Sequence, residues 1–224
     1  MADLPSDAQH ARLILASTSP RRRELLARFR LPFEVMAVDV PETPLPGEAP
    51  EQTAARLALA KAHAALATVP RDTHALIIAA DTVVVYRGQS LGKPESLDAA
   101  VRMLRRLRGH THRVVSAVAV LDSRSGRTRV RTETTRVRLR LMSDEEIDRY
   151  VATGDPLDKA GAYAIQNRAF HPVESIRGCY SNVVGLPLCA LAEELVEFGV
   201  RVPDKWRARG RTCQCAECMG AIAG

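Results

Sequence analysis

The chain has 224 residues, of which 46% are hydrophobic and 26% are charged, a balance that excludes a disordered or fibrous protein. Its length corresponds to one domain or two small lobes. No apolar run approaches the roughly 18 residues of a membrane span, and the N-terminus lacks the pattern of an export signal, so we expect a cytoplasmic protein with no membrane contact. The net charge of +6 favours anionic partners. An aromatic content of 4% gives little support to nucleic-acid binding by base stacking, and phosphorylated small molecules fit equally well.

The first part of the chain predicts strands and helices in alternation. The segment 12–17 is apolar and predicts a buried strand, and 20–29 carries leucines and a phenylalanine at helical spacing. A second strand is expected over 31–38. A loop rich in Pro and Glu then extends to Pro50, after which an alanine-rich helix over 51–68 is expected.

The middle of the chain carries the strongest strand signal. The run 75–86 is almost entirely apolar and β-branched, and the segment 87–94 contains two glycines and a proline typical of loops. Leucines and a valine at helical spacing predict a helix over 97–108. Two strands over 111–122 and 128–141, joined at a Ser-Gly turn, predict a hairpin.

Basic and apolar side chains alternate in the second hairpin strand, so arginines should line one face and apolar groups the other. These residues are Arg136, Arg138 and Arg140 on one face and Val137, Leu139 and Leu141 on the other. We interpret the arginine face as solvated rather than as a polyanion site. Ser143 is expected to cap a short helix, and a last helix should run from Pro187 to near Gly199 after a loop-rich segment. The whole pattern indicates a mixed α/β sheet.

The turn after the first strand is a candidate anion site. Ser19 can cap the following helix and Pro20 suits its first position, so backbone N–H groups and the positive end of the helix dipole point out of the turn. Three arginines, 21–23, stand in the same helical turn and oppose the dipole. A bound polyphosphate would resolve this conflict. Alternatively, the arginines extend into solvent or pair with acidic side chains elsewhere.

A second candidate is Asp81, which interrupts the apolar run 75–86 and should be partly buried. Such a carboxylate can hold a divalent metal or act as a general base toward water, or it can be a hydrogen-bonded structural residue. Lys61 and Lys93 could meet phosphates, although most lysines are solvated. Gln166 has the donor and acceptor atoms needed to read a base.

Six segments in order resemble the Maf family of nucleotide pyrophosphatases: LILASTSPRRRELL, AADTVV, LGKP, LRGHTHRVVSAVAV, DKAGAYAIQ and GCYSNVVGLPL. The resemblance implies an α/β fold, an elongated mixed sheet flanked by helices, with a central cleft between two lobes. It also implies metal-dependent hydrolysis of a nucleoside triphosphate to the monophosphate and pyrophosphate, by a homodimer. We expect a flexible arm over 1–11, the Maf-like domain over 12–200 and a basic, cysteine-containing tail over 201–224.

The resemblance assigns roles to individual residues. Asp81 falls on the family's proton acceptor, and Arg21, Thr82 and Gln166 fall on its specificity positions. The family's phosphate-side positions match Ser17, Arg22, Lys61 and Lys93. Glu42 matches a second acidic residue, which together with Asp81 would hold Mg²⁺ or Mn²⁺. The AGAYAIQ segment resembles the branch that acts on dTTP and UTP, but Asn167 stands where that branch commonly has Gly, which bears on base selection.

Two other functions remain open at this point. One is a non-catalytic regulator of cell division that binds nucleotide or nucleic acid, and the other is a pyrophosphatase for modified bases.

The cysteines divide into two groups. Cys179 and Cys189 have apolar neighbours and should be core residues. Cys213, Cys215 and Cys218 could bind Zn²⁺, but a closed site needs four ligands, so a disordered tail is the preferred interpretation.

Overall fold

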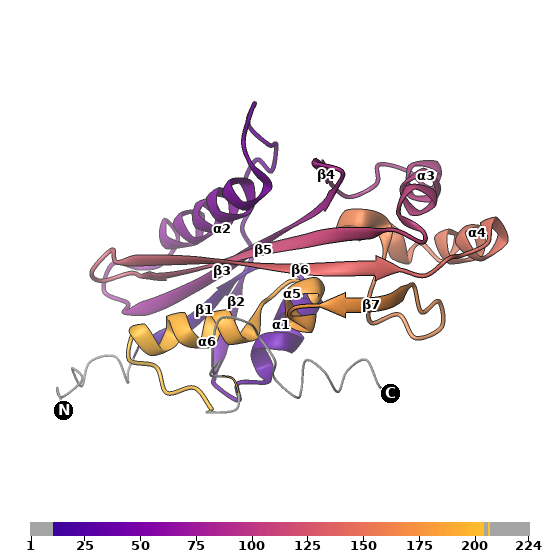
Figure 1. Ribbon diagram of the computed structural model, residues 1–224. Helices are drawn as coiled ribbons and strands as arrows, with labels where there is room; N and C mark the ends of the chain where they lie inside the picture. Colours follow the sequence, from indigo (N-terminus) through magenta and orange to yellow (C-terminus); the bar gives the residue numbers. More distant parts are fainter. Residues whose placement is uncertain (1–10, 204–205, 207–224) are drawn as a thin grey trace.

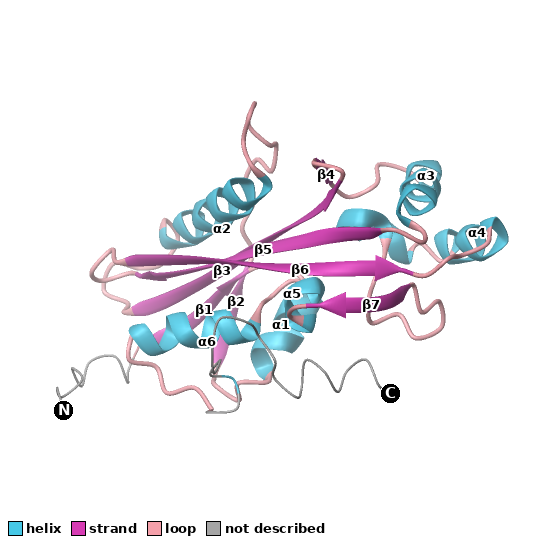
Figure 2. Cartoon of the chain, viewed as in Figure 1, coloured by secondary structure: helices cyan, strands magenta, loops and turns pink. Residues whose placement is uncertain are grey.

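A computed structural model describes residues 11–203 and Trp206, and in this part of the chain helices flank both faces of one mixed sheet (Figure 1, Figure 2). The strands are β1 (Arg12–Ala16), β2 (Phe33–Met36), β3 (Ala75–Tyr86), β4 (Gln89–Leu91), β5 (Thr111–Asp122), β6 (Thr128–Leu139) and β7 (Val173–Arg177). The α-helices are α1 (Pro20–Ala27), α2 (Pro50–Leu66), α3 (Leu97–Leu107), α4 (Asp144–Ala152), α5 (Tyr180–Val184) and α6 (Leu188–Glu197). Two short 3₁₀ helices follow α4, η2 (Asp155–Asp158) and η3 (Ala160–Ala162). Among the described helices, none combines the length and apolar character needed to cross a bilayer.

The order of the strands creates a crevice at the end of β1. The sheet runs β2-β1-β3-β5-β6-β7, and β1 is parallel to both of its neighbours. The chain moves from β1 through α1 to β2, then crosses back through α2 to β3, so the two helices pack on opposite faces. In open α/β sheets, a crevice forms where connections diverge at the carboxyl ends of such strands. The fold therefore predicts a ligand site just beyond Ala16.

The long strands extend the sheet past this crevice. β3 pairs with β1 only over Ala75–Ile78 and continues to Tyr86, while β5 follows it along nearly its whole length. β5 and β6 form the predicted hairpin. Beyond Ile78, β3 therefore has one edge that β1 does not cover, and β4 pairs with β3 only over Val84–Tyr86.

Alanines hold α2 close to the sheet. The buried members of this contact are Ala54, Ala58, Ala62 and Ala65 on the helix and Ala79, Ala117 and Ala119 on β3 and β5. Their spacing of three or four residues along α2 places them on one face. Because these side chains are small, the backbone of α2 can approach the strands closely. Lys61 belongs to the same buried face of α2.

Two of the three large apolar clusters support the expected two-lobed arrangement. One packs α1 and α6 against the sheet, and the other surrounds α3 and α4, which lie at one end of the long strands (Figure 1). The first cluster also contains Val202 and Trp206, whose ring lies 5.8 Å from that of Phe29. The packed core thus extends beyond residue 200. The remaining parts of the arm and the tail, with Cys213, Cys215 and Cys218, lie outside the described residues.

Most predicted elements are confirmed, most of them with shorter ends, and five short ones were missed: β4, η2, η3, β7 and α5. The segment 87–94 contains β4 as well as loop, and the segment expected to be loop-rich contains η2, η3, β7 and α5. The last helix begins at Leu188, with Pro187 preceding it at the cap position. Cys179 and Cys189 are buried, as predicted.

Two details of the local predictions were wrong. The side chain of Ser19 makes no capping hydrogen bond, and the Ser19 N–H donates to Ser17 Oγ at 3.2 Å. Leu141 is exposed, since β6 ends at Leu139 and the alternation stops there. Val137 and Leu139 are buried and Arg136 and Arg138 are exposed, as the alternation predicts.

Candidate active site

A cleft of about 400 Å³ opens beside the edge of β3 that β1 does not cover. It brings together all nine residues that the family resemblance singled out: Ser17, Arg21, Arg22, Glu42, Lys61, Asp81, Thr82, Lys93 and Gln166. They come from distant parts of the sequence, which meet where β1 ends and β3 continues. The crevice expected from the strand order is thus lined by the predicted residues.

The turn between β1 and α1 supplies one polar wall of the cleft. α1 begins with Pro20, and its first turn contains no acidic side chain. Ser17 is buried, and its Oγ accepts hydrogen bonds from the Ser19 N–H at 3.2 Å and from Arg22 Nη1 at 3.5 Å. The opening of α1 into the cleft is therefore electropositive, from both the helix dipole and the arginines.

A lysine joins two carboxylates at the centre of the cleft. Lys61 Nζ lies 2.6 Å from Asp81 Oδ1 and 2.6 Å from Glu42 Oε1. Asp81 is 6% exposed and Lys61 is 8% exposed, so this pair is shielded from water. Lys93 is exposed and lies 4.0 Å from the other oxygen of Glu42. Burial opposes ionisation of Glu42, but the hydrogen bond and charge of Lys61 outweigh it, and the pKa of Glu42 is lowered.

The guanidinium of Arg22 connects α1 to two other parts of the cleft. Its Nε donates to the carbonyl of Gly185 at 2.9 Å, and its Nη2 lies 3.4 Å from Thr82 Oγ1. Thr82 Oγ1 also lies 2.8 Å from Ser116 Oγ. Burial lowers the pKa of Arg22, and the negative charge of Asp81 opposes this effect. Arg22 therefore presents a fixed positive charge next to Asp81.

Gly185 has a conformational role in this contact. Its φ of 122° lies in a region that residues with a side chain rarely adopt. A Cβ at Gly185 would also lie 3.6 Å from both Arg22 Nε and Thr82 Oγ1. This glycine lets the backbone turn its carbonyl toward the arginine.

Another part of the cleft is lined by Gln166 and apolar side chains. Gln166 follows Tyr163, Ala164 and Ile165, all of which line the cleft. Val84 and Val114 contribute from β3 and β5. An apolar surface with one amide side chain is suited to a heterocyclic base, whose faces are apolar and whose edge forms hydrogen bonds.

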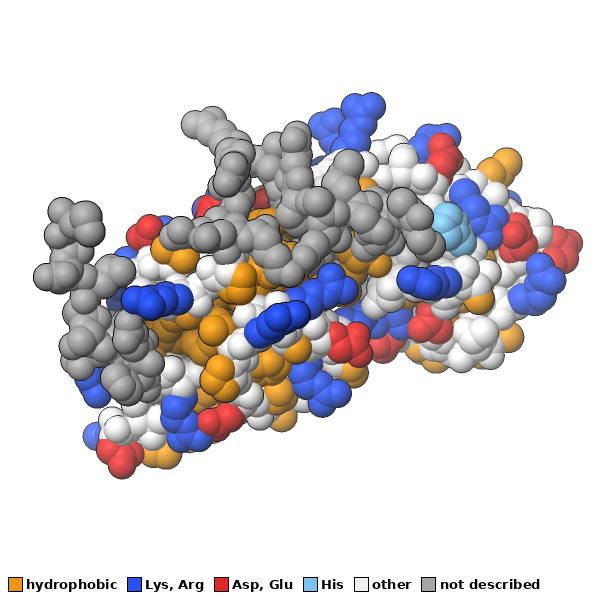
Figure 3. All heavy atoms as spheres, turned by 90° about the horizontal axis from the view of Figure 1, so that it is seen from below, with side chains coloured by type: hydrophobic (Ala, Val, Ile, Leu, Met, Phe, Trp, Pro, Cys, Tyr) orange, Lys and Arg blue, Asp and Glu red, His pale blue; other side chains and the backbone are white. Residues whose placement is uncertain are grey.

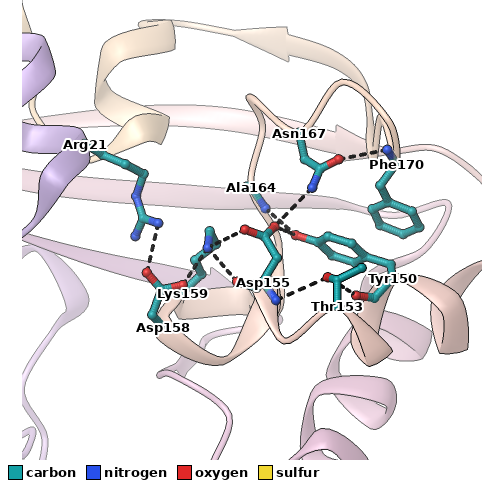
Figure 4. Close-up of polar contacts among 9 residues, drawn as sticks. All are labelled: Arg21, Tyr150, Thr153, Asp155, Asp158, Lys159, Ala164, Asn167 and Phe170. Atoms are coloured by element: carbon teal, nitrogen blue, oxygen red, sulfur yellow. Dashed lines mark hydrogen bonds and ion pairs between the residues drawn. The ribbon is translucent and has the colours of Figure 1, made fainter.

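Arg21 closes one side of the cleft through an ion pair. Its Nη1 lies 3.1 Å from Asp158 Oδ2 in η2, so the arginine points away from α1 toward this short helix (Figure 4). This contact corresponds to one of the two alternatives for the arginines, pairing with an acidic side chain. Arg23 is exposed, in agreement with the other possibility, extension into solvent.

Two arginines of the predicted arginine face pair with acidic side chains. Arg138 pairs with Glu174 at 3.0 Å, and Arg140 pairs with Glu146 at 2.9 Å. On the face seen from below, Lys and Arg side chains are scattered among hydrophobic and acidic ones (Figure 3). These contacts agree with the interpretation of the arginine face of β6 as solvated rather than as a polyanion site.

The acidic residues of the cleft fit a divalent cation whose remaining ligands come from water and a bound phosphate compound. Asp81 and Glu42 offer carboxylate oxygens, the ligands that Mg²⁺ and Mn²⁺ prefer. Within the described residues, no group of three or more His, Cys, Asp or Glu side chains could form a metal site by itself. Mg²⁺ is typically bound by one or two carboxylates together with waters and substrate phosphates, which matches this donor set.

A buried histidine supports the apolar part of the cleft. His112 is 2% exposed, and its Nε2 lies 2.7 Å from the hydroxyl of Tyr163, which lines the cleft. Burial lowers the pKa of His112 from 6.5 to about 4. His112 is thus neutral at pH 7 and serves as a packing and hydrogen-bonding residue.

This histidine should make the fold sensitive to acid. Because the unfolded chain binds a proton at His112 below pH 6.5 and the folded chain does not until about pH 4, its contribution to stability is lost as the pH falls through this window. We expect a loss of about 3 kcal/mol in the free energy of unfolding from this group. Urea unfolding of the wild type and of His112→Gln between pH 4 and 7 measures it. Parallel pH dependences of the two proteins would contradict the prediction.

Some lining residues were not predicted from the sequence. Tyr163, Val183, Val184 and Gly185 belong to segments that carry the family resemblance, but no role was assigned to them. The position of Gly185 between apolar residues was the signal in the sequence that could have indicated its role. Lys159 also lines the cleft, and its ammonium is occupied by Asp155 and Asp158.

Known proteins resemble this chain over most of its length. The sequence model of the family described as Maf-like protein matches residues 12–198. A dTTP/UTP pyrophosphatase of Geobacter sulfurreducens is 49% identical over 191 residues, covering 85% of this chain and 98% of that protein. A dTTP/UTP pyrophosphatase of Pelotomaculum thermopropionicum is 49% identical over 190 residues, with the same coverage of both chains, and one of Aromatoleum aromaticum is 46% identical over 200 residues, covering 84% and 96%. The chain therefore belongs to the Maf family.

Proposed function

We propose that this protein hydrolyses dTTP and UTP, including forms with modified pyrimidines, to the nucleoside monophosphate and pyrophosphate. The observation that carries the proposal is the cleft, in which a shielded Asp81–Lys61 pair lies between an electropositive helix start and an apolar surface with Gln166. The relatives named dTTP/UTP pyrophosphatase, at up to 49% identity, support the substrate class. The base and the triphosphate would occupy the apolar and the charged parts of the cleft, respectively.

In the proposed reaction, a water molecule attacks the α-phosphorus of the triphosphate. Asp81 accepts a proton from this water, and the bond between the α-phosphorus and the oxygen bridging to the β-phosphate breaks, releasing pyrophosphate. Lys61 holds the Asp81 carboxylate in position through its 2.6 Å contact. Negative charge that develops on the leaving pyrophosphate would be stabilised by Arg22, Lys61, Lys93 and the first N–H groups of α1.

We propose that Asp81 and Glu42 hold Mg²⁺ or Mn²⁺ when the triphosphate binds. The ion would polarise the phosphoryl oxygens and neutralise their charge. Lys61 contacts both carboxylates at 2.6 Å and would have to share them with the cation. On this proposal, Glu42 is held in place by Lys61 and Lys93 before the substrate arrives.

Pyrophosphate release from purified protein tests the proposed function. We expect equal amounts of monophosphate and pyrophosphate from dTTP and UTP in the presence of Mg²⁺ or Mn²⁺, and none after chelation of the metal. Release from another base would retain the reaction and change the substrate. Tight polynucleotide binding without release from any triphosphate would contradict the proposal and favour the non-catalytic regulator.

We also propose that the protein is a homodimer in the cytoplasm. The family resemblance supports the dimer, and the cytoplasm contains the nucleoside triphosphates that are the proposed substrates. Analytical ultracentrifugation over a range of protein concentrations measures the oligomeric state. A single species with the mass of one 24.5 kDa chain would contradict the dimer.

A further inference from the structure

A network of hydrogen bonds holds both ends of the segment 164–167, which carries Gln166; its two end residues, Ala164 and Asn167, are labelled in Figure 4. At its centre, the carboxylate of Asp155 in η2 accepts from Tyr150 Oη at 2.6 Å and from Asn167 Nδ2 at 3.2 Å, both at Oδ2. Its other oxygen, Oδ1, accepts from Lys159 Nζ at 2.9 Å. Three side chains thus converge on one carboxylate: Tyr150 of α4, Lys159 between η2 and η3, and Asn167, which follows Gln166.

The chemistry of these groups fixes the direction of each hydrogen bond. Burial opposes ionisation of Asp155, but hydrogen bonds from Tyr150, Lys159 and Asn167 outweigh it and lower the pKa of Asp155. An ionised carboxylate only accepts, so the Tyr150 hydroxyl must donate to it. The hydroxyl oxygen can then accept from the N–H of Ala164, at 3.0 Å. Tyr150 therefore connects Asp155 to the backbone that lines the cleft.

Asn167 secures the other end of the same segment. Its amide nitrogen donates to Asp155, and its amide oxygen accepts from the N–H of Phe170 at 2.8 Å. The Asn167 N–H donates to the carbonyl of Ala164 at 3.1 Å. The ring of Phe170 stacks on that of Tyr150, with centroids 3.9 Å apart. Gln166 is thus held between two anchored residues, Ala164 and Asn167.

Lys159 is committed to this network rather than to a ligand. Its ammonium has three N–H donors, and these contact the Asp155 carbonyl at 2.5 Å, Asp155 Oδ1 at 2.9 Å and Asp158 Oδ1 at 2.5 Å. Asp158 in turn pairs with Arg21 of α1. The network therefore ties the Gln166 segment to the side of the cleft where α1 begins.

We propose that Asp155, Tyr150 and Asn167 are positioning residues for base selection, which set the place of the Gln166 amide relative to the bound base. This inference deepens the proposed function and depends on it for the identity of the ligand. None of the three residues lines the cleft, so each acts through the segment 164–167 and not by touching the nucleotide. Asn167, the departure from the resembled branch, is on this view part of how this chain selects its base.

The test uses two variants that remove different contacts to Asp155. Asn167→Ala removes the amide without introducing glycine-like backbone freedom, and Tyr150→Phe removes the hydroxyl but keeps the ring that stacks on Phe170. Tyr86→Phe is the matched control, because Tyr86 is also a buried tyrosine of the same apolar cluster and does not line the cleft. For each protein, kcat and KM are measured with dTTP, UTP and GTP, and dissociation constants with their α,β-imido analogues.

We expect each variant to lose roughly three- to tenfold in discrimination between dTTP and GTP, the equivalent of one hydrogen bond. The loss should arise in KM for dTTP and in the dissociation constant of its analogue, with kcat changed less than about threefold. The double variant should lose little more than the larger single one, because both act through Asp155 Oδ2. Tyr86→Phe should keep the wild-type ratio.

Retention of the wild-type discrimination by both single variants would overturn the inference, as would an equal loss in Tyr86→Phe. If one variant fails to fold, the other still decides, since each breaks a separate contact. Absence of pyrophosphate release from the wild type would overturn the proposed function instead. In that case the dissociation constants decide, and a wild-type chain that binds all analogues equally would overturn the inference as well.

Discussion

Replacing Asp81 with Asn should reduce the rate of pyrophosphate release by about a thousandfold, within the range attributed to general acid–base catalysis. The amide keeps the shape of the side chain and an oxygen that can accept from Lys61, which lies 2.6 Å from Asp81 Oδ1. It cannot accept a proton from water at neutral pH, and it is a poorer ligand for a divalent cation. The measurement is the initial rate of pyrophosphate release from dTTP at saturating metal, together with thermal unfolding of both proteins.

The control for this prediction is Asp144→Asn. Asp144 is half-exposed, lies at the start of α4 and pairs with Arg108 at 2.6 Å, away from the cleft. We expect wild-type rates from this variant. An Asp81→Asn protein that turns over dTTP within tenfold of the wild type would show that Asp81 is a structural carboxylate, the alternative that the sequence left open.

The sequence predicts most of the fold because its signals are long. The apolar run of β3 and the alanine spacing of α2 each extend over at least ten residues and have one interpretation. β7 has five residues with only its first buried, and α5 has five residues that include two valines, which favour strands. Neither has a local pattern that distinguishes it from loop. Their structures depend on pairing with β6 and packing against β5, which a local pattern does not encode.

The charged residues of the candidate site could be predicted from the sequence, but the contacts that hold them in place could not. Asp81 interrupts an apolar strand, and such an interruption is visible in any single sequence. The pairing of Lys61 with both Glu42 and Asp81 joins residues about twenty positions apart on a loop, a helix and a strand. The hydrogen bond from Arg22 to Gly185 spans 163 positions. Such contacts depend on the order of the strands, so the sequence predicts which residues line the cleft but not which partners they contact.

Replacing Lys61 with Met should destabilise the protein by about 3 kcal/mol at pH 7 and abolish pyrophosphate release. Met retains the apolar stem of Lys61 but leaves Asp81, which is 6% exposed, as a shielded carboxylate without a cation. Breaking a buried pair on one side costs more than the pair contributes, because the remaining charge stays desolvated. Glu42 is half-exposed, so water screens its charge and the loss of its contact with Lys61 contributes less to the destabilisation. Urea unfolding gives the free energy.

The pH dependence and a double variant separate the charge effect from lost packing. The pKa of Glu42 is lowered from 4.5 in the wild type despite its partial burial, mainly by Lys61, so this stabilisation is present above pH 4.5 and is lost as the pH falls further. The stability difference between the wild type and Lys61→Met should therefore shrink in acid. Adding Asp81→Asn to Lys61→Met should restore much of the lost stability, since the second change removes the unpaired charge. A double variant less stable than Lys61→Met would contradict this account, because it would indicate that packing of the lysine stem, and not its charge, stabilises the cleft.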